Sequence, residues 1–300
     1  MIELLDPKND VVFQKIFGMK KHKEILISFL NSLLYFKGEN EIKEVTFEEK
    51  KMDVSLIANE KISILDLHVV TESNLNINVE IQLINQYNMI RRTIFYMSKM
   101  LLSQLQKGED YSSLNRTITI NILNFTYLKD DNFIKNYGLF EKKSKKPLTD
   151  LIEIIFVELP KFKNTHKDYN DKLHRWLMFL ANPSGREVQD FMKSDDTIKE
   201  AMDVLYEISG DKETIMLAQM REKALMDEQS RLKGAKEEGK IEGSILARQE
   251  DIIDSLKEIG QLSEDLINII ENQKNIDTLK VWIRFALKAN TIEEFENKIN

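Results

Sequence analysis

The sequence predicts an α/β (α+β) fold, in which a mixed β-sheet is flanked by helices and followed by an α-helical C-terminal region. Three observations carry this prediction. Apolar residues recur at helical spacing over residues 8–35. Residues 77–83 alternate strictly between apolar and polar side chains, which is the period of a β-strand. Residues 213–248 are rich in charged and helix-forming residues.

The predicted elements follow in order from the N-terminus. Two helices within residues 8–35 break near Gly18, and their apolar positions are Val12, Ile16, Ile25, Phe29 and Leu33. Strand-like segments are predicted around residues 52–58, 62–70, 77–84, 117–125 and 152–158. A long helix near residues 86–107 lies between the third and fourth of these strands. A helix between consecutive strands of one sheet implies a crossover connection, so we expect a mixed sheet.

The second and third predicted strands form a hairpin that should bring two carboxylates and an amide together. A short polar turn separates the strands. In the second strand of the hairpin the alternation puts Asn78, Glu80 and Gln82 on one face. In the first strand Asp66 interrupts a run of Ile, Leu and Val, where a carboxylate is costly unless a cation or hydrogen bonds compensate it.

Asp66 and Glu80 form half of a site for a hard cation, Mg²⁺ or Mn²⁺, which phosphate oxygens can complete. A metal bound there would lower the pKa of an attacking water and stabilise charge on phosphorus. The alternative is that both acids are ordinary polar residues at the edge of a solvated sheet. Spacing alone does not separate the two interpretations, because two acids and a glutamine match many sequences by chance.

A family resemblance favours the metal site. Asp66 with Glu80-Ile81-Gln82 resembles the PD-(D/E)XK restriction-endonuclease-like core, in the variant form of the Rpn family of recombination-promoting nucleases, which are also classed as transposases. The resemblance covers most of residues 1–225 in the same order. Its further segments are NDVVFQKIFG over residues 9–18, RTIFY over 92–96, QLQKGEDY over 104–111, LTD over 148–150 and ELPKF over 158–162.

The resemblance implies a Mg²⁺-dependent DNA endonuclease. In that family Asp66 and Glu80 would bind the metal, often with the backbone carbonyl of Ile81, and Gln82 would position water. Many superfamily members have Lys where Gln82 stands, but Gln is usual in this branch, so we do not interpret it as loss of activity. The resemblance does not identify the residue or group that acts as the general base. Asp10, on the first helix, lies where related folds bring in another acid.

Four further residues near the motif have accessory or structural interpretations. Arg92, Tyr96 and Lys99 fall on one face of the predicted long helix. Arg92 is expected either to donate to a scissile phosphate or to pair with a structural carboxylate, which would leave Tyr96 as core packing. His68 shares a strand face with Asp66, either as a general base or, more often for a lone histidine, as a hydrogen-bonded structural residue.

Composition limits the classes of protein to which the chain can belong. A chain of 300 residues with 42% hydrophobic content can bury a substantial core. It has no cysteine, so disulfides and thiolate metal sites are excluded. The sequence begins without the features of a secretory signal and has no run of about 18 apolar residues, so we expect a cytoplasmic protein without a membrane span.

The net charge of −7 does not exclude DNA as a partner, because affinity for phosphate depends on where charges lie. Basic runs gather in the nuclease-like part, whereas the tail is acidic. Any single run is more typical of a solvated surface, but together the runs are candidates to line a cleft. The candidate DNA contacts are Lys142, Lys143, Lys145, Lys146 and Lys161.

The sequence predicts three parts. A nuclease-like domain with a helical extension covers residues 1–225, a charged helical connector covers 226–249, and a small α-helical module covers 250–300. The connector is interrupted by Gly234, Gly239 and Gly243. Each of these costs up to about 1 kcal/mol in a helix interior, so we expect fraying or a hinge.

The small C-terminal module carries large apolar side chains such as Trp282, Ile283 and Phe285. So small a unit rarely shields such side chains alone. We therefore expect it to dock on the nuclease domain or to pair with a second chain in a homo-oligomer. A helix-turn-helix DNA reader is the less favoured alternative, because its surroundings are acidic.

The predicted function is a Mg²⁺-dependent DNA endonuclease. The competing class is a catalytically inactive module that binds nucleic acid or protein and retains the nuclease fold. A transposase that also joins strands follows from the family's classification and from no residue of this chain.

Overall fold

The computed structural model describes residues 3–48 and 67–299. The chain divides into two compact units, Met1–Met226 and Asp227–Asn300. The strand predicted around residues 52–58 lies outside the described residues, as does the start of the one predicted around 62–70.

Within the described residues of the first unit, six strands form one sheet in the order β1-β2-β3-β4-β6-β5. The pairs β3–β4 and β4–β6 are parallel, and the other pairs are antiparallel. The predicted mixed sheet is therefore confirmed. The strands are β1 Val45–Phe47, β2 Leu67–Thr71, β3 Asn76–Gln82, β4 Thr117–Leu123, β5 Ile134–Phe140 and β6 Pro147–Glu158.

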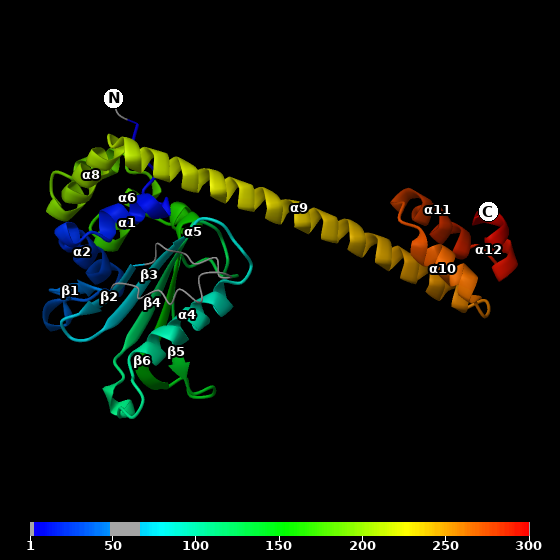
Figure 1. Ribbon diagram of the computed structural model, residues 1–300, viewed down its shortest axis with the longest axis horizontal. Coiled ribbons are helices and arrows are strands. Elements are labelled where there is room, and N and C mark those ends of the chain that lie inside the picture. Colours follow the sequence, from blue (N-terminus) through cyan, green and yellow to red (C-terminus); the bar gives the residue numbers. More distant parts are fainter. Residues whose placement is uncertain (1–2, 49–66, 300) are drawn as a thin grey trace. The chain divides into compact units, whose positions relative to one another are not determined.

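The predicted hairpin and crossover helix both occur. Strands β2 and β3 pair antiparallel, and their turn includes Asn74 with a left-handed backbone at φ 61°. The helix α4, Met89–Ser103, then connects β3 to the parallel strand β4. It covers one face of the sheet, whereas α1, α2, α6 and α8 lie on the other (Figure 1). The two faces therefore have different partners.

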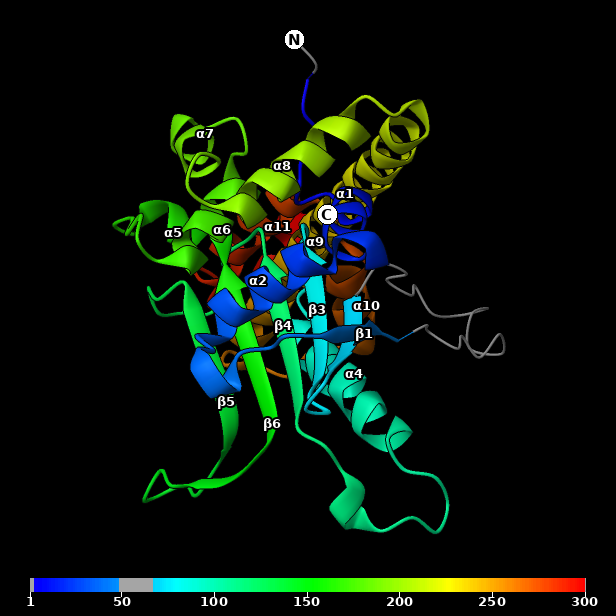
Figure 2. The same cartoon turned by 90° about the vertical axis from the view of Figure 1, so that its left-hand side faces the viewer.

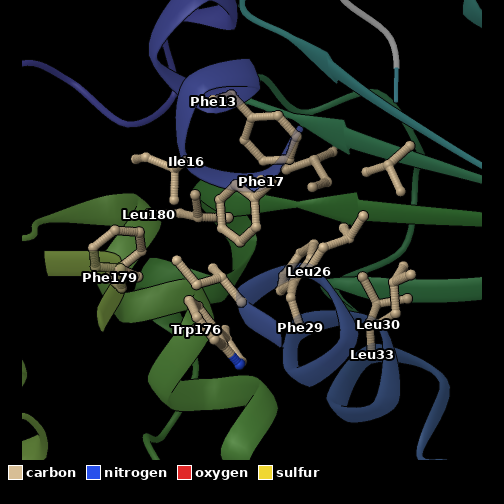
Figure 3. Packing of buried hydrophobic residues seen from close by; sticks show 14 of the residues in the cluster. Phe13, Ile16, Phe17, Leu26, Phe29, Leu30, Leu33, Trp176, Phe179 and Leu180 are labelled. Atoms are coloured by element: carbon tan, nitrogen blue, oxygen red, sulfur yellow. The ribbon is translucent and has the colours of Figure 1, made fainter. Parts of the chain in front are cut away.

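The face opposite α4 holds the main hydrophobic core. The rings of Phe17 and Phe29 lie 5.2 Å apart, and those of Phe17 and Trp176 lie 5.7 Å apart (Figure 3). Trp176 and Phe179 are fully buried, as expected for helix core. The helices on this side are α1 Asp10–Phe17, α2 Lys23–Leu34, α5 Leu159–Asn164, α6 Lys172–Ala181, α7 Arg186–Phe191 and α8 Asp196–Ser209.

Two described strands, β1 and β5, were absent from the prediction, and β6 begins earlier than predicted. The edge strand β5 has a register shift after Gly138 and leaves Tyr137 and Phe140 exposed. A bulged edge strand lacks the strict alternation that identifies β3. Short 3₁₀ turns complete the described part of this unit at Lys20–His22, Gly38–Asn40 and Tyr111–Ser113.

The second unit has a hydrophobic core of its own. The C-terminal part of α9, Lys212–Lys257, packs with α10 Glu264–Asn272, α11 Ile276–Ala286 and α12 Ile292–Ile299. Trp282 is 8% exposed and lies 6.4 Å from the ring of Phe295. The large apolar side chains are thus covered in part within the unit, because α9 adds its own apolar residues to the small module.

The helix α9 is continuous through Gly234, Gly239 and Gly243, where the sequence predicts fraying or a hinge. Ion pairs with i,i+3 spacing flank the glycines, one from Arg231 to Glu228 and one from Lys240 to Glu237. Such pairs and the surrounding helix-forming residues offset part of the glycine cost. No helix in the described ranges is long and apolar enough to cross a membrane.

Candidate active site

The strand β3 presents its polar side chains to the face of the sheet that α4 covers. Its register with β4 places Asn78 opposite Thr119, and Glu80 opposite Asn121. The alternate residues of β3 enter the main core on the other side. The predicted alternation is therefore correct, but the polar face is enclosed rather than solvated, since Glu80 is only 1% exposed.

Glu80 is held by side chains from α4 and from its own strand. Arg92 Nε donates to Glu80 Oε1 at 2.8 Å, and Arg92 Nη2 lies 2.6 Å from the same oxygen. The side-chain amide of Gln82 also donates to that oxygen. A buried carboxylate needs such compensation. Of the two roles predicted for Arg92, the structure shows the pairing with a carboxylate, and that carboxylate belongs to the candidate site.

Tyr96 supports Arg92 from the same helix. The guanidinium carbon of Arg92 lies 5.1 Å from the centre of the Tyr96 ring, within the range of a cation–π contact. Lys99 Nζ lies 5.9 Å from that ring and 4.6 Å from the ring of Phe95. The stripe predicted on this helix is thus present, and Tyr96 is only partly buried instead of being core packing.

Two neighbours of the site were not found from the sequence. Thr93 Oγ1 donates to Asn121 Oδ1 at 2.9 Å, and both residues are buried. The signal that points to Asn121 is the alternation of Thr, Ile and Asn over residues 117–122, which repeats the period of β3. The sequence gives only a weak signal for Thr93, since a single threonine in a predicted helix does not indicate a buried hydrogen bond.

Asp66, the other predicted metal ligand, lies outside the described residues. His68, two residues later in the sequence, lies on β2 opposite Asn78 and is partly buried. The sequence alternation assigns Asp66 and His68 to the same strand face. The structure therefore brings His68 beside the strand that carries Glu80.

Asp10 begins α1 and is 6% exposed. Its carboxylate accepts from Arg221 of α9 and from the backbone N–H of Val11. The adjacent Asn9 lines a small cavity of about 110 Å³ together with Leu83, which follows Gln82. The start of α1 thus lies near the C-terminal end of β3, with Asp10 engaged in an ion pair.

The four lysines of residues 142–146 are exposed in the turn between β5 and β6. Glu141 orders this turn, because its carboxylate accepts hydrogen bonds from the backbone N–H groups of Lys143 and Ser144. These bonds lower the pKa of Glu141 to about 2. The turn lies far from Glu80. Phe156 shares the sheet row of Glu80, and at about 3.3 Å per residue the stretch from Pro147 to Phe156 spans roughly 30 Å. Figure 2 shows the turn at the end of the sheet opposite α1.

Lys161, expected among the DNA contacts, is instead an internal residue. Its side chain is 9% exposed, and its Nζ lies 2.5 Å from Glu158 Oε2. The same ammonium donates to the carbonyl of Leu128 at 2.9 Å. Glu158 also accepts from the backbone N–H of Leu128, so this pair secures the chain after β4. Pairing with Glu158, the last residue of β6, explains why a lysine is buried here.

The donor chemistry around Glu80 fits a hard cation. A buried carboxylate oxygen, the backbone carbonyl of Ile81 and the side-chain oxygen of Gln82 come from one strand end, and oxygen is the donor that Mg²⁺ and Mn²⁺ prefer. Within residues 3–48 and 67–299, no three His, Cys, Asp or Glu side chains gather as a metal site. A complete site would therefore need Asp66.

Comparison with known protein families gives a match over most of the chain. The family model described as PD-(D/E)XK nuclease family transposase matches residues 7–235. That range covers more than half of the chain and includes Glu80, Gln82 and the whole of α4. No curated protein and no solved structure matches the chain.

Proposed function

Because the chain belongs to the PD-(D/E)XK nuclease family transposases, we propose that it is a Mg²⁺-dependent DNA endonuclease of the recombination-promoting Rpn type. The observation that carries this proposal is the placement of Glu80. Its carboxylate is buried in a polar layer of the sheet and contacts Arg92 and Gln82. A buried carboxylate with a cationic partner is a candidate for a functional site, and Glu80 is the one that stands in the family motif.

The proposed metal ligands are Asp66, Glu80 and the backbone carbonyl of Ile81. Asp66 directly precedes β2 in the sequence and is assigned by the family motif. When bound, a divalent cation lowers the pKa of an attacking water and stabilises the charge that develops on phosphorus. Mn²⁺ has the same preference for oxygen ligands and is proposed to substitute for Mg²⁺.

The other residues of the site bind and orient. The side-chain N–H of Gln82 donates a hydrogen bond to Glu80. This leaves the amide oxygen of Gln82 to accept a hydrogen bond from the attacking water. Arg92 brings a planar guanidinium to the site, which is the side chain best suited to phosphate oxygens. Tyr96 packs against that guanidinium and limits its movement. His68 and Asp10 are proposed as accessory residues.

DNA is the proposed substrate, and the lysines of residues 142–146 are proposed as phosphate contacts remote from Glu80. They are exposed and lie on a turn that Glu141 holds by hydrogen bonds. The lysines and Glu80 are roughly 30 Å apart, and about 3.4 Å separates successive base pairs of DNA. A duplex that reaches both would therefore be contacted by the lysines about one helical turn from the cut.

Self-association through the C-terminal helices is a further part of the proposal. The second unit retains exposed apolar side chains, with Ile269 48%, Val281 42% and Leu287 71% exposed. Pairing with a second copy would cover them. A dimer would also join two nuclease domains, so that two single-strand cuts give a double-strand break.

The competing function, a module that keeps the fold without the reaction, is favoured by one observation. Arg92 already compensates the charge of Glu80, so this carboxylate does not require a cation for stability. Incubation of purified protein with supercoiled plasmid separates the two functions. The nuclease nicks or linearises the plasmid in Mg²⁺ or Mn²⁺ and stops when a chelator is added, whereas the module binds DNA and leaves it intact.

A further inference from the structure

Two side-chain hydrogen bonds from one helix, together with the register of two neighbouring strands, form a circuit around Glu80. Glu80 on β3 lies opposite Asn121 on β4. Asn121 accepts the hydrogen bond of Thr93 on α4, and the preceding residue of that helix, Arg92, donates to Glu80. The circuit therefore joins the candidate site to the helix that covers it.

Burial and hydrogen bonding fix the middle of this circuit. Thr93 is 1% exposed and Asn121 is fully buried. While Asn121 Oδ1 accepts from Thr93, its Nδ2 donates to the carbonyl oxygen of Ile155 on β6 at 3.2 Å. Because an amide has one acceptor end and one donor end, only one orientation of Asn121 satisfies both partners. A flip or a shift of the helix would leave buried polar groups unpaired, which is costly.

The other buried side chains of α4 constrain its orientation less than the hydrogen bond of Thr93 does. Met89 and Met97 are apolar, and apolar packing tolerates rotation and sliding. A hydrogen bond to a side chain of the sheet sets both the rotation of the helix and its position along β4. The hydrogen bond from Thr93 therefore fixes the helix at the residue next to Arg92.

We propose that Thr93 and Asn121 are positioning residues, which act on the reaction by holding the guanidinium of Arg92 against Glu80. This inference rests on the proposed nuclease function for its catalytic consequence. The geometric part, that Thr93 fixes Arg92, stands independently of any activity. Neither Thr93 nor Asn121 is assigned a contact with substrate.

Thr119 provides a matched control. It lies on β4 two residues before Asn121, on the same face of the sheet, and is 1% exposed. Its hydroxyl has no hydrogen-bond partner among the described residues. Thr119→Val and Thr93→Val therefore remove the same atom from equally buried sites, but only the second breaks a bond of the circuit.

The experiment follows the Nε–H signal of Arg92 by NMR in protein labelled with ¹⁵N-arginine, with Arg92→Lys assigning the signal by its loss. Thr93→Val should raise the hydrogen-exchange rate of this N–H about tenfold, the value of one buried hydrogen bond. Thr93→Ser, which keeps the hydroxyl, should restore the slow exchange. Thr119→Val should match the wild type.

The same proteins are then compared in plasmid cleavage with Mg²⁺. Thr93→Val should lower kcat about tenfold and change KM little, because Arg92 is displaced and not removed. Equal Arg92 exchange in Thr93→Val and Thr119→Val would overturn the proposal. Where the wild type cleaves, equal kcat in the two variants would overturn it as well. If Thr93→Val does not fold, Thr93→Ala breaks the same bond with less bulk.

Absence of cleavage by the wild type would count against the proposed function, not against the positioning of Arg92. The exchange rates alone then decide whether Thr93 holds Arg92. The two failures are therefore distinguishable.

Discussion

Arg92 Nη2 lies 2.6 Å from Glu80 Oε1, so the helix that connects β3 to β4 also supplies the cation for the carboxylate at the end of β3. The contact is enclosed, since the side chain of Arg92 is 14% exposed and that of Glu80 is 1% exposed. Helix, strand and charge pair therefore form one local unit. A change in the position of α4 changes the site.

Replacement of Gln82 by Lys tests the role of the third motif residue. Gln82→Lys should fold and keep at least part of the cleavage activity, because an ammonium can donate to Glu80 as the amide does. Plasmid cleavage and metal-binding calorimetry on the variant check this. A folded variant that binds metal and cuts nothing would show that the site arranges water in another way.

Lys161 is predicted to contribute to stability and not to DNA binding. Lys161→Met should lower the free energy of unfolding by about 3 kcal/mol, because it leaves Glu158 buried without its cationic partner. Lys163→Met on the same helix removes an exposed charge and should change stability by less than about 0.5 kcal/mol. Urea unfolding compares the two. Equal stability of both variants would refute the buried ion pair.

The lysine turn between β5 and β6 is predicted to contact phosphates. Changing Lys142, Lys143, Lys145 and Lys146 to Gln should weaken DNA binding and reduce the slope of log K against log salt by about 1 for each lysine engaged. Fluorescence anisotropy at several salt concentrations measures the slope. An unchanged slope would show that DNA does not reach this turn.

The C-terminal unit is predicted to mediate self-association. Sedimentation of the full chain should give a larger assembly than a chain ending at Ser230, because the exposed apolar side chains of the second unit are then missing. The nuclease-like unit ends at Met226 and is retained in the shorter chain. Monomeric masses for both chains would exclude this route to a dimer.

The sequence predicts those parts of the fold whose pattern is local. Strict alternation identifies β3, and helical periodicity identifies α4 and the buried Trp176. The edge strand β5 escapes prediction because its exposed side chains and its bulge obscure the alternation. Periodicity reports which face is buried, and an edge strand has little buried face.

For the site, sequence alone places Glu80 and Gln82 on one strand face but does not choose the partner of Arg92. That choice depends on how the crossover seats α4 on the sheet, which is a tertiary relation. The same limit explains why the burial of Lys161 is not predicted. Its partner Glu158 is near in sequence, but Lys161 is buried because the chain around Leu128 also contacts it. The lysine run lies at the other end of the sheet from Glu80, and composition does not report this separation.

The most direct test of the central claim is cleavage of supercoiled plasmid by the wild type, Asp66→Ala and Glu80→Gln, purified identically and incubated with Mg²⁺. The wild type should give nicked or linear DNA. Both variants should be slower by at least about a hundredfold, since several kcal/mol of charge stabilisation are lost with a metal ligand. Equal cleavage by the wild type and the variants, or no cleavage by a wild type that binds DNA, would contradict a metal-dependent nuclease centred on Glu80.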